Sequence, residues 1–144
     1  MNVKGFTLIE SLIVLFICTV FMLLPTLSIN KWKQALEVDQ FLSSFEKKLL
    51  FTQQMAVVNT IDTQIIFLEQ AKQIKFKDGQ VVEKGLTIPV SLQTVGPDKL
   101  TFKKGSGNID KLSKFSFSWT EKNQLIEFQF QLGSGRYVKK INRL

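Results

Sequence analysis

A run of nineteen residues near the N-terminus, Phe6–Leu24, holds a single charged side chain, that of Glu10. As an α-helix, such a run rises roughly 28 Å, which is about the thickness of the hydrocarbon core of a bilayer. Lys4 lies just before the run, and a basic flank predicts that this end stays in the cytoplasm. We therefore expect residues 6–29 to form a single-pass membrane helix, with the rest of the chain outside.

A cleaved secretory signal peptide is the main alternative for an apolar segment in this position. Such peptides are cut after the apolar core, at small residues of the Ala-x-Ala type. The residues after Leu24 read Pro-Thr-Leu-Ser-Ile-Asn-Lys and contain no such site. The apolar segment is therefore expected to stay in the mature protein, with a kink or a local opening at Pro25, which lacks a backbone N–H.

Residues 30–58 are predicted to form an amphipathic helix that follows the apolar one. Apolar residues recur there at helical spacing, with polar residues over much of the remaining surface. A stop is expected at Asn59-Thr60, because Asn tolerates the left-handed conformation of a helix cap. The apolar positions, which include one residue just before this segment, are Ile29, Trp32, Leu36, Phe41, Leu42, Phe45, Leu49, Met55 and Ala56.

Beyond the helix the pattern becomes that of β-strands. The apolar residues of 115–119 and of 126–132 alternate with polar ones, which predicts an antiparallel hairpin laid on the apolar face of residues 29–56. Shorter strands are expected at 65–68, 74–76, 81–82, 86–88 and 137–138, with turns at 78–79 and 96–98. The expected fold class is α+β: a long N-terminal helix, and an extracytoplasmic domain of residues 30–144 in which helix 30–58 packs against one small antiparallel sheet, residues 62–140.

The residues around Gly5 carry the most specific motif in the chain. The stretch from Lys4 to Glu10, Lys-Gly-Phe-Thr-Leu-Ile-Glu, resembles the processing site of type IV pilins and type II secretion pseudopilins. That site is a short basic leader and a Gly, followed by Phe-Thr-Leu-Ile-Glu at the start of a membrane helix. The likeness in detail covers about thirty residues. The Lys-rich, cysteine-poor remainder is most similar to the ComGD-like minor subunits of Gram-positive competence pili.

The resemblance implies a role for three residues. A prepilin peptidase would cut between Gly5 and Phe6, removing residues 1–5 as a leader, and the new N-terminus of Phe6 would be methylated and stay charged. A carboxylate inside a membrane helix costs roughly 2.5–3.5 kcal/mol on insertion scales, so Glu10 is expected to have a functional partner. The resemblance implies the amine of Phe6, in the same or a neighbouring subunit, as the contact that sets axial register during assembly. The alternative is a glutamate that reaches the membrane surface by itself.

Catalysis is not expected of this chain. It has no histidine, which is the commonest general base and metal ligand. Its one cysteine, Cys18, lies inside the apolar run and cannot form an intramolecular disulfide. The acidic residues are scattered singly, and no phosphate-binding loop or calcium loop is present. We therefore predict no enzymatic activity, no cofactor and no metal site.

The basic excess of the chain lies in its C-terminal part, where residues 59–144 carry fourteen basic and eight acidic side chains. Such a balance suits a polyanion such as DNA, although it is also ordinary solubility charge. Trp119 and Tyr137 could stack on bases if they are exposed, whereas a buried Trp119 and solvated lysines are the simpler interpretation. The candidate DNA contacts are Lys103, Lys104, Lys139, Lys140 and Arg143.

Three functional hypotheses follow. The first is a minor structural subunit of a competence pilus, which takes part in DNA uptake, is assembled through its N-terminal helix and ends at the cell surface. Its partners would be other pilin subunits, the prepilin peptidase, the membrane and, directly or through the filament, DNA. The second is a membrane-anchored surface protein that binds DNA and is never polymerised. The third is a secretion pseudopilin of the same fold.

Overall fold

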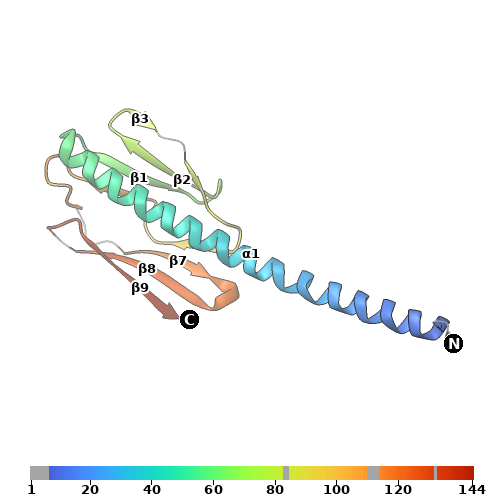
Figure 1. The fold of residues 1–144 in the computed structure, drawn as a ribbon. Coiled ribbons are helices and arrows are strands. Elements are labelled where there is room, and N and C mark those ends of the chain that lie inside the picture. Colours follow the sequence, from blue (N-terminus) through green and yellow to red (C-terminus); the bar gives the residue numbers. More distant parts are fainter. Residues whose placement is uncertain (1–6, 83–84, 110–113, 132) are drawn as a thin grey trace. The chain divides into compact units, whose positions relative to one another are not determined.

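The computed structural model describes residues 7–82, 85–109, 114–131 and 133–144, and at residues 24–28 the backbone alone (Figure 1). The predicted cleavage site between Gly5 and Phe6 lies outside these residues. The chain divides into two compact units, Met1–Leu36 and Glu37–Leu144, which are described separately. Helix α1, Leu8–Val58, is the one α-helix of the described residues, and every other regular element lies in the second unit.

In the first unit, α1 begins with backbone N–H groups of Glu10 and Ser11 that donate to the carbonyl of Thr7, at 3.1 and 3.3 Å. Thr19, a polar residue within the apolar run, donates its hydroxyl to the carbonyl of Leu15 at 2.5 Å, so its polar group is satisfied inside the helix. The helical backbone continues across Pro25, and the local opening expected there stays a prediction. No helix within the described residues is long and apolar enough to cross a membrane.

In the second unit, α1 buries one stripe of side chains. The buried positions recur every three or four residues, as expected for one face of an α-helix: Val38, Phe41, Leu42, Phe45, Leu49, Thr52 and Ala56. The expectation that this face starts near residue 29 is wrong, because Ile29, Trp32 and Leu36 are 54%, 71% and 43% exposed. Helical periodicity runs through residues 29–36 and through residues 38–56 alike, so the sequence pattern does not distinguish exposed apolar positions from buried ones.

The helix ends at Val58, as predicted. The left-handed residue that follows is Thr60, with φ of 52°, and not Asn59. The Asn59 side chain instead donates to the carboxylate of Asp78 at 3.1 Å. The turn after the helix is therefore tied to the end of a neighbouring strand by the amide that was expected to act as the cap.

The strands form two antiparallel sheets and not the single sheet expected from the sequence. The first sheet has five strands, in the order β3-β2-β1-β6, with β4 also paired to β2. Its strands are β1 Thr63–Leu68, β2 Gln73–Asp78, β3 Val81–Val82, β4 Leu86–Thr87 and β6 Lys99–Phe102. Alternate residues of β1 are buried, which places Thr63, Ile65 and Phe67 on the core side of the sheet.

The second sheet has the order β5-β7-β8-β9. It contains β5 Leu92–Val95, β7 Lys114–Trp119, β8 Gln124–Phe130 and β9 Tyr137–Arg143, with a 3₁₀ turn at Thr120–Lys122. The hairpin predicted from alternation is confirmed, and Asn123 closes its turn in the left-handed conformation, with φ of 53°. The last strand is longer than the predicted 137–138 and pairs with β8 along its whole length.

The core of the second unit is rich in phenylalanine. Phe45 of α1 packs its ring against rings of both sheets, among them Phe67 of β1 at 6.3 Å and Phe117 of β7 at 5.2 Å between centroids. The rings of Phe67 and Phe115 stack at 3.7 Å, so the two sheets also touch one another directly. The expected α+β class, with a long helix packed on antiparallel strands, is confirmed (Figure 1).

Candidate functional site

The first candidate site is the apolar part of α1 around Glu10. Between residues 8 and 23, its large apolar side chains are 38% to 83% exposed, on every side of the helix. A helix that is apolar all round is stable only when something covers it, whether lipid or other protein. The exposed side chains are Leu8, Ile9, Leu12, Ile13, Val14, Leu15, Phe16, Ile17, Val20, Phe21, Met22 and Leu23.

Glu10 is the single charged side chain of this surface. It is exposed, and within the part of the chain that the structure describes its carboxylate has no ion-pair partner. The predicted partner, the amine of a processed Phe6, lies outside the described residues. The helix thus places one carboxylate, unpaired among the described residues, in a band of exposed apolar side chains.

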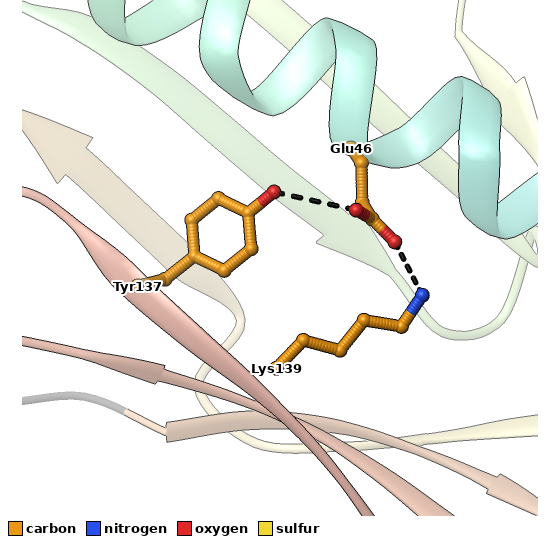
Figure 2. Close-up of polar contacts among 3 residues, drawn as sticks. All are labelled: Glu46, Tyr137 and Lys139. Atoms are coloured by element: carbon orange, nitrogen blue, oxygen red, sulfur yellow. Dashed lines mark hydrogen bonds and ion pairs between the residues drawn. The ribbon is translucent and has the colours of Figure 1, made fainter.

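A second arrangement joins α1 to the last strand. Glu46 projects from α1 toward two side chains of β9, as Figure 2 shows. Its Oε1 atom lies 2.5 Å from the ammonium of Lys139, and its Oε2 atom accepts a hydrogen bond of 3.5 Å from the hydroxyl of Tyr137. About a third of the Lys139 and Glu46 side chains is exposed, so solvent screens the ion pair.

Burial raises the pKa of the Tyr137 hydroxyl above its ordinary value of 10.0, and the neighbouring charge of Glu46 and its hydrogen bond act in the same direction. The phenol therefore stays protonated at neutral pH and keeps donating to the carboxylate. The arrangement fixes the start of an edge strand on the helix, and nothing in its geometry suggests proton transfer.

The five candidate DNA contacts do not form one surface. Lys139, Lys140 and Arg143 all lie on β9, but side chains alternate along a strand, so Lys140 faces the opposite side from the other two. The charge of Lys139 is paired with Glu46, and the ammonium of Lys140 donates to the side chain of Gln129 at 3.3 Å.

Lys103 and Lys104 lie outside β9, in the loop that follows β6. The backbone N–H of Lys104 donates to Asp62 at 2.8 Å, so this loop is anchored near the start of β1. Trp119 is only 3% exposed, which confirms that it belongs to the core and is not a surface on which bases could stack. Within the described ranges, no group of three His, Cys, Asp or Glu side chains could hold a metal ion.

Comparison with known proteins adds to this geometry. Residues 1–24 match the family described as the prokaryotic N-terminal methylation motif. Over 142 residues the chain is 30% identical to the competence protein ComGD of Streptococcus pneumoniae (strain ATCC BAA-255 / R6), an alignment that covers 96% of this chain and 80% of that protein. The chain belongs to the ComGD family.

Solved structures support the fold of this family member. The type IV minor pilin FimU of Pseudomonas aeruginosa superposes with a TM-score of 0.56 at 13% identity, over 72% of this chain and 88% of that one. The minor pseudopilin EpsH from the type 2 secretion system of Vibrio cholerae gives a TM-score of 0.56 at 15% identity, over 72% and 96% of the two chains. The fold is therefore that of type IV minor pilins and minor pseudopilins.

Sequence reasoning missed Glu46, which it placed among the ordinary polar surface residues of the helix. Its two partners lie 91 and 93 residues further along the chain, so no local pattern could have identified them. Glu10, in contrast, stands out in the sequence itself, because an isolated charge in a long apolar run is unusual, and the role expected of it stays a prediction.

Proposed function

We propose that this chain is a minor structural subunit of a competence type IV pilus, which is processed by a prepilin peptidase after Gly5 and assembled through the N-terminal part of α1. In this proposal, the subunit waits in the cell membrane as a single-pass protein with a cytoplasmic N-terminus. It then leaves the bilayer for the filament at the cell surface.

The observation that carries the proposal is the exposed apolar surface of residues 8–23 with Glu10 in it. Burying an apolar surface is worth about 25 cal/mol per Å², so a helix that exposes a dozen large apolar side chains gains strongly from any apolar cover. Lipid before assembly and the helices of other subunits after it both supply such cover. A soluble subunit that never polymerised would gain nothing from this segment.

The carboxylate of Glu10, which has no ion-pair partner within the described ranges, supports assembly over simple anchoring. A membrane anchor needs no charge, and an acidic residue lowers the stability of the inserted helix. An ammonium on a processed Phe6 would neutralise that charge, and it exists only if the chain is cut. Processing and assembly are therefore linked in this proposal through one ion pair.

The mass of the mature chain tests processing. Material extracted from pili, or from membranes of cells that build them, should lack residues 1–5 and carry one N-terminal methyl group. Gly5→Val should leave the leader in place and keep the subunit out of filaments, whereas Asn2→Val, a similar change inside the leader, should be processed normally. Mature material that still begins at Met1 would exclude this function.

Glu10 itself is tested by neutral and charged replacements. Glu10→Gln keeps the size of the side chain and removes its charge, so incorporation into filaments should fall by at least tenfold while membrane insertion is unchanged or stronger. Glu10→Asp, which keeps the charge, should be incorporated into filaments to a greater extent than Glu10→Gln. Ser11→Ala changes a neighbouring polar residue without affecting the charge and serves as the control. Equal incorporation of the Gln variant and the Ser11 control would remove the role assigned to Glu10.

Direct binding of DNA is a second candidate function, and the geometry favours it less. One of the five candidate cations, Lys139, is already paired with a carboxylate. The other four are divided between the two faces of β9 and the loop after β6. A gel-shift assay of the full chain in detergent at low and high salt tests it, with Lys140→Ala/Arg143→Ala as the variant and Lys75→Ala/Lys77→Ala as a control of equal charge. DNA retardation that depends on salt and on β9 would establish the activity.

A further inference from the structure

Strand β9 is the edge of its sheet, and the described residues leave its outer side unpaired. It pairs with β8 from Tyr137 to Arg143 and with no other strand. The N–H of Leu144 donates to Asn123, and the carbonyl of Arg136 accepts from Gln131, which fixes the hydrogen-bonding pattern of the pair. By alternation, Tyr137, Lys139, Ile141 and Arg143 turn their backbone N–H and C=O groups away from β8.

This edge is unusually open for a strand of seven residues. Six of its seven residues are exposed, and the apolar side chains of Val138 and Ile141 are 41% and 59% exposed, on opposite faces of the strand. A long edge with unpaired backbone groups and exposed apolar side chains is a template for another strand. Within the described part of the chain, no helix or strand fills the position beside it.

A groove accompanies the edge on the side of the helix. It has a volume of about 440 Å³ and runs between α1 and β9, with the apolar side chain of Leu50 along it, itself 45% exposed. Its remaining lining residues are Asp39, Leu42, Ser43, Glu46, Lys47 and Lys139. An added strand would place alternate side chains over this groove, because successive residues of a strand point to opposite faces.

The charge of the edge indicates the partner. Strand β9 carries Lys139, Lys140 and Arg143 and no acidic residue, and Glu46 neutralises only the first of these. A second copy of β9 would set three cations against three, which is unfavourable for cross-strand neighbours. An acidic strand would find opposite charges instead, so self-pairing is disfavoured and an acidic partner is favoured.

Resting on the proposed function, we propose that the free edge of β9 binds an acidic, extended segment of a different pilin subunit as an additional strand. The backbone groups of four β9 residues supply the hydrogen bonds, and Lys140 and Arg143 select the charge of the segment. The groove beside Leu50 receives its inward-facing side chains. Edge lysines can also serve to prevent pairing. Here Glu46 neutralises the lysine closest to the helix, and the apolar side chains beside it remain uncovered, which favours a docking edge.

A photo-crosslinker at Val138 tests this proposal in cells that assemble the pilus. The expected product joins this chain to a different pilin subunit, through a peptide of net negative charge. The control places the crosslinker at Val95, which is 54% exposed at the opposite edge of the same sheet and should not capture that peptide. Capture of a second copy of this chain, of DNA or of a basic peptide would overturn the proposal, as would the absence of any product specific to Val138.

Backbone and charge variants test the mechanism of pairing. Ile141→Pro removes an outward N–H without breaking a bond to β8, and proline is tolerated at such edge positions. Loss of one such hydrogen bond should lower the crosslink yield by about fivefold relative to Ile141→Ala, which keeps the N–H. Arg143→Glu should lower the yield similarly, while Lys114→Glu, an exposed change within β7, should not. Equal yields in the Pro and Ala variants would contradict pairing through the backbone.

The same experiment separates this proposal from the proposed function. The mass and the filament incorporation of each variant are measured alongside its crosslink. A subunit that is processed and incorporated but gives no crosslink at Val138 refutes only the docking edge. A subunit that still begins at Met1 and never enters filaments refutes the proposed function, whatever its crosslinks.

Discussion

Replacing Phe45 by alanine should remove a large part of the stability of the second unit. The side chain lies on α1, is 0% exposed and has ring neighbours on both sheets. Its ring packs against five others, at centroid distances of 5.2 to 6.4 Å. No other described ring joins the helix to both sheets, so its removal opens a cavity where the three layers meet.

The expected loss in the free energy of unfolding follows from these contacts. Replacing a buried Phe by Ala costs about 3–5 kcal/mol, from lost transfer free energy and the cavity left behind. Aromatic pairs add about 0.5–1.5 kcal/mol each beyond burial, so five ring neighbours place this site at the upper end, near 4–5 kcal/mol. Domains of this size unfold with about 5–15 kcal/mol, so the variant should be close to its stability limit.

Urea unfolding of the full chain in detergent micelles measures the effect. Trp119 is 3% exposed in the same core and reports unfolding by fluorescence, while Trp32, at 71% exposed, changes little. Leu50→Ala is the control on the same helix: its side chain is 45% exposed, and its loss should stay below about 1 kcal/mol. If Phe45→Ala lowers the free energy of unfolding by less than about 2 kcal/mol, or by no more than the control does, the central role assigned to this ring is wrong.

Two further predictions concern the turns and the edge strand. Gly135→Ala should destabilise the chain more than Gly133→Ala in the same unfolding assay. Both glycines have positive φ, but a Cβ at Gly135 would collide with the carbonyl oxygen of Gly107, whereas one at Gly133 would meet nothing within 4 Å. Tyr137 is the single tyrosine of the chain, so its ultraviolet absorbance should titrate above pH 10, and Glu46→Gln should bring that pKa closer to 10. The unfolded chain loses the Tyr137 proton at a lower pH than the folded chain, so the free energy of unfolding should fall as the pH rises above about 10. The Tyr137→Phe variant has no such proton, and its free energy of unfolding should fall less over the same pH range.

The sequence predicted those elements whose signal is local. Residues 115–119 and 126–130 alternate strictly between apolar and polar, and they form the β7–β8 hairpin with the expected core face. The end of α1 at Val58 was likewise predicted, because the helical period stops there and short strand patterns begin. In both cases the pattern and the fold agree over a window of about ten residues.

Strands β5 and β6 were missed because each has only four residues and their partners are distant. They flank the turn predicted at 96–98, and no strand was predicted directly on either side of that turn. Strand β5 pairs with β7 and β6 pairs with β1, so neighbouring strands of the sequence belong to different sheets. That division is a property of long-range pairing, and this is why one sheet was expected where two exist.

Residues 8–23 and residues 38–56 of α1 differ in the exposure of their apolar side chains, so changes in the two stretches are expected to have different effects. Between Val38 and Ala56, apolar side chains are buried along one stripe, so changes there alter the stability of the second unit. Between Leu8 and Leu23, apolar side chains are exposed all round, so changes there alter only what an external partner can bury. Variants of Glu10 should therefore leave the urea midpoint reported by Trp119 unchanged, even where incorporation into filaments is lost. The helical period is the same in both stretches, and burial alone distinguishes the stretch that packs in the core of the second unit from the stretch that joins subunits in the proposed function.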